Sequence, residues 1–197
     1  MYSKLPNLVF GFHGCDQSVF DRVVKQGEKI NESHNSYDWL GHGSYFWENG
    51  YHRALNWAKS SPKISQPAVI GAVIDLGYCL NLTDYDSSEV LRRGYEILKI
   101  RCDEAKTLLP SNRESKKTED VLLRDLDCAV LEQIHDFNRE TEKQGYDSVR
   151  GIFIEGERVY QGSEFRERTH VQLCIINPNC IKGVFAPRNQ DKKHIIP

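Results

Sequence analysis

Short apolar stretches of β type lie near both ends of the chain, whereas apolar residues in its middle recur every three or four positions. Stretches of the first kind, bounded by glycine, proline or polar clusters, predict strands. The expected strands cover residues 7–13, 43–47, 68–76, 149–155, 158–161, 169–176 and 181–185. The helical period predicts two long helices, at about 87–109 and 119–143, joined by a polar linker at 111–117.

Two shorter helices are expected in the first third of the chain. Asp16 can cap the start of a helix that runs to about Gln26, and Gly27 stands where a helix-ending glycine belongs. Asn49 is the expected N-cap of a second helix, which runs to about Lys59. Each helix would therefore follow directly after a strand.

These elements predict how the chain is organised as a domain. Strands from both ends of the chain would form one antiparallel sheet, and the two long helices would be inserted between them. A chain of 197 residues can bury about 70% of its unfolded surface, so one core suffices. The sequence therefore predicts an α+β fold with a single domain over residues 1–197 and a helical insertion at about 86–146.

Composition excludes some classes of protein. With 39% hydrophobic and 27% charged residues the chain is of globular type, and its net charge of −2 predicts no general attraction to nucleic acid. No apolar run suits a signal peptide or a membrane span, so we expect a cytoplasmic protein without a membrane partner. The six cysteines contain no C-x-x-C pair, and we expect free thiols and no metal site.

Two glycine-containing segments carry candidate chemistry. Phe12-His13-Gly14-Cys15 and Gly41–Trp47 both read as strand edges, where glycine lets a backbone approach a neighbour closely. The first offers the imidazole of His13 and the second the phenol of Tyr45. Both groups suit a nucleotide, and a helix with aromatic residues follows each segment. The two segments together predict a cleft for a planar ligand that carries a ribose.

The order of these motifs resembles the ADP-ribosyltransferase fold. The likeness is to the diphtheria-toxin and poly(ADP-ribose) polymerase branch, whose signature is His, Tyr and Glu on three strands. It covers about residues 7–85 and 145–186 and leaves the helices between them unexplained. The resemblance implies a split antiparallel sheet, NAD as co-substrate without a metal, and an NAD-dependent ADP-ribosyltransferase that transfers a pentosyl group.

The resemblance also assigns roles to residues. His13 would bond a ribose hydroxyl, the Gly14 backbone would bond the nicotinamide amide, and Tyr45 would stack on the nicotinamide ring. A second family aromatic falls on Asn56, and the neighbouring Trp57 is the expected substitute. The expected NAD-binding residues are His13, Gly14, Gly43, Tyr45 and Trp57.

The third signature position departs from the family pattern. Gln172 stands where the family has glutamate; it can bond a ribose hydroxyl but supplies no negative charge. Glu164 or Glu167, in the loop upstream, could supply that charge, and His170 is a further candidate for activating the acceptor. The loss of the glutamate favours single transfer over polymer growth. The expected catalytic residues are Gln172, His13, Tyr45 and Glu164.

Several functional readings remain open from the sequence. The leading one is a mono-ADP-ribosyltransferase that resembles intracellular bacterial toxins of toxin–antitoxin or phage-defence systems. Its acceptor would be RNA, DNA or protein, and an antitoxin protein joins NAD among the expected partners. The alternatives are an NAD glycohydrolase, a non-catalytic module that binds NAD or ADP-ribose, and a chance match to the motifs.

Overall fold

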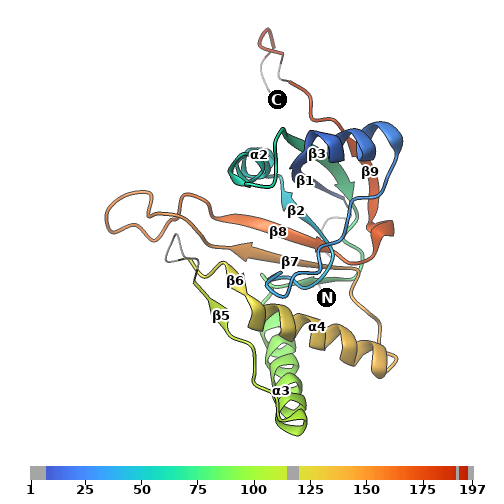
Figure 1. Ribbon diagram of the computed structural model, residues 1–197, viewed down its shortest axis with the longest axis vertical. Coiled ribbons are helices and arrows are strands. Elements are labelled where there is room, and N and C mark those ends of the chain that lie inside the picture. The colour runs from blue at the N-terminus through green and yellow to red at the C-terminus, as the bar shows by residue number, and fades with distance from the viewer. Residues whose placement is uncertain (1–7, 115–119, 190, 195–197) are drawn as a thin grey trace.

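The computed structural model describes residues 8–114, 120–189 and 191–194, and its centre is a seven-stranded sheet (Figure 1). The strand order is β4-β7-β8-β2-β1-β3-β9. The strands are β1 (Val9–Asp16), β2 (Ser44–Glu48), β3 (Pro67–Ile74), β4 (Cys79–Asn81), β7 (Ser148–Phe153), β8 (His170–Ile175) and β9 (Ile181–Phe185). Strands from the two ends of the sequence are therefore neighbours, since β8 pairs with β2.

The sheet is mixed rather than antiparallel throughout. Neighbouring strands run antiparallel except β4 and β7, which pair in parallel through Leu80 and Val149. Between these two strands the chain crosses the whole helical insertion, and a parallel pair needs such a long crossover. The architecture agrees with the α+β class that the sequence predicts, and β4 is a strand that the sequence pattern did not predict.

The helices lie toward opposite ends of the sheet (Figure 1). Their bounds are α1 (Gln17–Phe20), continued by a π-helical turn (Asp21–Lys25), α2 (Tyr51–Ser60), α3 (Ser87–Ala105), α4 (Asp125–Glu140) and a 3₁₀ turn (Pro178–Cys180). The insertion also contains a small ribbon of β5 (Asn112–Arg113) and β6 (Leu123–Arg124). β5 occupies part of the linker that the sequence predicted at 111–117. Residues 115–117 of that linker lie outside the described residues.

Two larger clusters of buried side chains, and a smaller one around Trp47, Ala54 and Val69, hold these elements together. One lies around Phe46, Ile70 and Leu173 and includes the first helix. The other joins the insertion to the sheet through Leu131 of α4, Val149 of β7 and their neighbours. Within the insertion, Gly94 of α3 lies so close to α4 that an added Cβ would be 2.5 Å from Ile134 Cγ1. The insertion is thus packed on the sheet beside the strands that carry the candidate motifs.

Local details confirm some sequence predictions and correct others. Asp16 does cap α1 by accepting from the Ser18 N–H, and Gly27 has a positive φ of 76°. Asn49 is not an N-cap: its own φ is 50°, and Gly50 precedes α2 instead. Residues 158–161 form no strand. They belong to a projecting hairpin whose two arms meet at a single bridge between Arg158 and Arg166.

Candidate functional site

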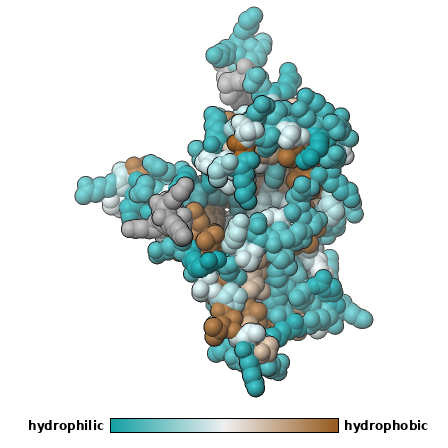
Figure 2. Space-filling view, viewed as in Figure 1, coloured by the Kyte–Doolittle hydropathy of each residue, from teal (hydrophilic) through white to brown (hydrophobic). Residues whose placement is uncertain are grey.

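A cleft of about 590 Å³ lies over β1, β2 and β8, between α2 and the segment that precedes β2. In Figure 2 a recess separates the projecting hairpin from the lobe that contains α2. The cleft is lined by all the residues expected to bind NAD and by the glutamine at the third signature position: His13, Gly14, Gly43, Tyr45, Trp57 and Gln172. Three separate stretches of the sequence therefore converge on one surface.

The floor of the cleft opens where β1 and β2 part. Their pairing ends at Phe12 and Trp47. The Asn49 N–H donates to the Phe10 carbonyl at 2.9 Å, so the even-numbered residues of β1 direct their backbone polar groups toward β2. Because this direction alternates along the strand, the N–H and C=O of Gly14 also point toward β2, into the gap beyond the last pair of Phe12 and Trp47. Gly14 thus offers both a backbone donor and a backbone acceptor at the edge of the cleft.

His13 takes the hydrogen bond that would otherwise continue the ladder. Its Nδ1 lies 2.9 Å from the Tyr45 carbonyl oxygen. A carbonyl only accepts, so this contact assigns the proton to Nδ1. Burial lowers the pKa of His13, and the neutral ring then keeps its lone pair on Nε2. His13 can therefore accept a hydrogen bond from a hydroxyl group of a ligand.

Close packing explains why two of the motif positions are glycine. A Cβ on Gly14 would lie 2.4 Å from the Ala54 carbonyl oxygen and 3.2 Å from Trp57 Cε3. A Cβ on Gly43 would lie 2.6 Å from the Ile175 carbonyl oxygen. Glycine at position 14 lets α2 approach β1, which brings Trp57 to the wall of the cleft. Glycine at position 43 lets the start of β2 approach β8.

The hydroxyl of Tyr45 is occupied by the protein itself. It accepts from the Leu40 N–H at 3.0 Å and donates to the Gly41 carbonyl at 2.8 Å. Burial raises the pKa of this phenol well above its usual value. Tyr45 is therefore poorly suited to proton transfer, and what it offers the cleft is the side of its ring.

Gln172 is oriented by an indole. Trp39 Nε1 donates to Gln172 Oε1 at 2.5 Å, which leaves the amide NH₂ of the glutamine to donate elsewhere. Trp39 reaches this position because β7 has Gly151 opposite Gln172, where a Cβ would lie 2.8 Å from Trp39 Cη2. Gln172 can thus present a hydrogen-bond donor to the cleft.

The structure does not bring Glu164 or Glu167 into the cleft lining. The side chain of Glu164 is 87% exposed and pairs with Arg158 at 2.6 Å. The loop that carries both residues folds back on itself, and the Glu167 N–H bonds the Glu157 carbonyl. Because the arms of this hairpin pair with one another, the carboxylate of Glu164 is turned toward solvent rather than toward Gln172.

The sequence analysis singled out none of the four charged residues that line the cleft in the described part of the chain, which are Asp38, Arg53, Glu155 and Arg168. Arg53 of α2 pairs with Glu155, which follows β7, and both side chains are largely buried. The Arg53 guanidinium also lies 5.4 Å from the centroid of the Trp47 ring. A signal was present, because Arg53 precedes Trp57 by one helical turn and so shares its face of α2. Nothing in the sequence indicated its partner 102 residues away.

Aromatic rings extend along the cleft on both sides of Gln172. Trp47 and Trp57 have ring centroids 5.7 Å apart, and His170 stacks on Phe153 at 5.6 Å with an interplanar angle of 22°. Burial lowers the pKa of His170, which favours its neutral form. A wall of this kind suits planar groups, which gain stacking energy as well as hydrophobic burial.

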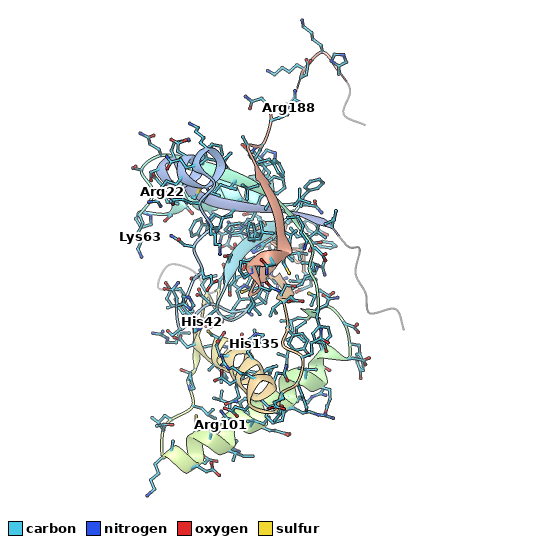
Figure 3. The ribbon with its side chains drawn as sticks, turned by 90° about the vertical axis from the view of Figure 1, so that its right-hand side faces the viewer. Arg22, His42, Lys63, Arg101, His135 and Arg188 are labelled. Carbon is cyan, nitrogen blue, oxygen red and sulfur yellow. The ribbon has the colours of Figure 1, made fainter. Side chains whose placement is uncertain are left out.

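The helical insertion supports one wall of the cleft. The Ser36 hydroxyl donates to Asp125 at 2.8 Å, and the His42 N–H donates to Glu132 at 2.7 Å. Figure 3 shows His42 close to α4, the helix that carries His135. The segment from about residue 31 to residue 43, which lines the cleft and leads into β2, is therefore held in place by α4.

Other classes of site find no support within the part of the chain that the structure describes. No group of three or more His, Cys, Asp or Glu side chains is arranged to hold a metal ion there. No helix in that part of the chain has the length and apolar character of a membrane span.

No model of a protein family matches this chain, and none of the curated proteins is significantly similar to it in sequence.

Proposed function

We propose that this protein is an NAD-dependent mono-ADP-ribosyltransferase with an ADP-ribosyltransferase-like fold. The observation that carries the proposal is the convergence of His13, Tyr45 and Gln172 in one cleft, at the point where two central strands separate. The motif resemblance assigns the same three residues to the binding of NAD. The parting of β1 and β2 further supports the split sheet that the resemblance implies.

The chain's own groups fit the nicotinamide half of NAD. The Gly14 backbone would pair with the carboxamide, and the rings of Tyr45 and Trp57 would hold the nicotinamide by stacking. His13 Nε2 would accept from a ribose hydroxyl, and the Gln172 amide would donate to a ribose oxygen. NAD itself supplies a glycosidic bond with a good leaving group, which breaks with positive charge developing on the sugar. The residues of the cleft would fix its orientation.

The setting of the reaction follows from the same resemblance. A neutral glutamine at the third signature position favours one transfer to each acceptor site, with RNA, DNA or protein as the acceptor. We propose an intracellular bacterial toxin of the toxin–antitoxin or phage-defence type, acting in the cytoplasm and restrained by an antitoxin protein.

A double-label experiment tests the reaction. The protein is incubated with NAD labelled in the nicotinamide or in the adenylate, together with bacterial RNA, DNA or protein. The expected result is release of nicotinamide with transfer of adenylate label to one acceptor class. Label that ends only in free ADP-ribose would identify an NAD glycohydrolase. Binding of NAD by calorimetry without turnover would identify a binding module, and either result contradicts the proposal.

Matched tyrosine variants control for contamination, and thermal unfolding checks that each variant is folded. Tyr45→Ala removes a ring from the cleft, whereas Tyr85→Ala removes one that is 88% exposed and lies outside the cleft lining. Loss of a positioning group predicts a rate about 100-fold lower for Tyr45→Ala. The Tyr85→Ala protein should retain the rate of the unaltered protein. Equal activity of both variants would remove Tyr45 from the site.

A further inference from the structure

The cleft contains a carboxylate, that of Glu155, which the motif analysis did not single out. Among the described residues, the carboxylates that line the cleft belong to Asp38 and Glu155. Asp38 is committed to its own loop, because its two oxygens accept from the backbone N–H and the side-chain amide of Asn35. Glu155 has no such local role.

Glu155 has one charged partner and one uncommitted oxygen. Its Oε1 accepts from Arg53, and no hydrogen bond from the described residues reaches Oε2. The side chain is only 6% exposed although it lines the cleft. A carboxylate can accept about four hydrogen bonds, so most of the capacity of Glu155 is unused.

The backbone around Glu155 is fixed on both sides. The Arg168 N–H donates to the Glu155 carbonyl at 3.2 Å, which extends the pairing of β7 and β8 beyond Phe153 and His170. The next N–H, of Gly156, donates to Asp120 at 3.0 Å. The carboxylate is therefore held in position before any ligand binds, as catalytic groups must be.

The buried ion pair between Arg53 and Glu155 carries a desolvation cost that lowers the stability of the fold. Removing two charges from water is unfavourable unless their remaining hydrogen-bonding groups are satisfied. Arg53 Nε is buried without a partner in the described residues. Arrangements that break a folding rule in this way are expected at functional sites, where a ligand completes the set of contacts.

We propose that Glu155, held by Arg53, is the catalytic carboxylate that accepts the proton of the acceptor. This inference rests on the proposed function. In the step, the nucleophilic atom of the acceptor bonds to the ribose C1, and the bond from C1 to the nicotinamide nitrogen breaks. Its electron pair stays on nicotinamide, and the proton of the nucleophile passes to Glu155.

Glu155→Gln and Glu164→Gln form a matched pair of tests. Both variants neutralise a glutamate that is paired with an arginine, but only the first changes the cleft. Nicotinamide release is measured from labelled NAD in a bacterial extract that supplies RNA, DNA and protein. Loss of a general base predicts a rate about 100-fold or more below that of the unaltered protein for Glu155→Gln, and an unchanged rate for Glu164→Gln.

The outcomes separate this inference from the proposed function. If the unaltered protein releases nicotinamide and transfers adenylate label to an acceptor, and Glu155→Gln does both at the same rate, the assignment of Glu155 is wrong and the proposed function stands. If the unaltered protein releases none, both fail. Calorimetry with NAD and thermal unfolding check that each variant is folded.

Glu155→Asp distinguishes a catalytic role of the carboxylate from a purely structural role. It keeps the charge on a side chain one methylene shorter, so it should be more active than Glu155→Gln while binding NAD. Equal loss of activity and of NAD binding in both variants would assign Glu155 to structure and overturn the inference.

Discussion

Single residues in this cleft combine a structural and a ligand-facing role. The Tyr45 hydroxyl joins two backbone groups of the preceding turn, while its ring lines the cleft. His13 uses Nδ1 to replace a missing ladder bond and keeps Nε2 for a ligand. In each case the internal bond fixes the group that faces outward, which lowers the entropy lost on binding.

Removing only the hydroxyl of Tyr45 separates these roles. Tyr45→Phe leaves the Leu40 N–H without its acceptor, and an unsatisfied buried group costs about 1–3 kcal/mol. We expect the free energy of unfolding in urea to fall by about that amount. Tyr85→Phe, at an exposed position, should change it by less than about 0.5 kcal/mol. Equal stability of the two variants would show that the hydroxyl does not hold the turn.

At the scale of elements, the cleft depends on how closely α2 packs against β1. The contact is possible because Gly14 has no side chain facing the Ala54 carbonyl. The glycine in the sequence predicted that another part of the protein approaches the backbone closely here. The structure shows that the neighbour is the backbone of α2. The start of the other helix is set by Asp16, whose carboxylate also accepts from the backbone N–H groups of Ser65 and Gln66.

Gly14→Ala tests the packing of α2. The added methyl group would overlap the Ala54 carbonyl, and overpacking of this kind costs about 1–3 kcal/mol. We expect a lower unfolding midpoint in urea and weaker NAD binding, because Trp57 would move with the helix. Gly145→Ala is the control, since a Cβ there meets no atom within 4 Å. Unchanged stability of Gly14→Ala would mean that α2 shifts freely.

Asp16 predicts a pH dependence of stability. Hydrogen bonds from Gln66 and Ser18 lower its pKa in the folded protein. A group with a lowered folded pKa stabilises the fold above its unfolded value of about 3.9, and that contribution is lost as the pH falls below it. The free energy of unfolding in urea should therefore fall less for Asp16→Asn than for the unaltered protein as the pH is lowered from about 5 to about 2. Parallel losses would contradict this role.

At the scale of the whole molecule, the insertion and the sheet act as one unit. Glu132 of α4 bonds the His42 backbone and lies 3.3 Å from the His42 ring, so the insertion fixes the approach to β2. The cleft is thus built by segments that the sequence separates widely. Among the described residues, none that lines the cleft lies on α3 or α4, so under the proposed function the insertion would support NAD binding only indirectly, by fixing the segment that leads into β2.

Glu132→Ala tests that coupling. Loss of both contacts should loosen the segment that leads into Tyr45, and we expect NAD affinity measured by calorimetry to fall about tenfold. Glu140→Ala is the control, because Glu140 lies on the same helix and pairs with Arg101 away from the cleft. If the two variants bind NAD equally well, α4 does not position the cleft.

Taken by itself, the sequence misplaced the cap at Asn49 and the strand at 158–161, but it determined many of the local features, because caps, turns and strand periods depend on residues close in the chain. Asp16, Gly27 and the strand at 181–185 are examples, and the spacing of the two motifs already pointed to a shared site. Only the tertiary structure decided which side chains meet across long separations. It paired Arg53 with Glu155, turned Glu164 to solvent and placed β4 parallel to β7. Those outcomes depend on how whole elements pack, which no local pattern encodes.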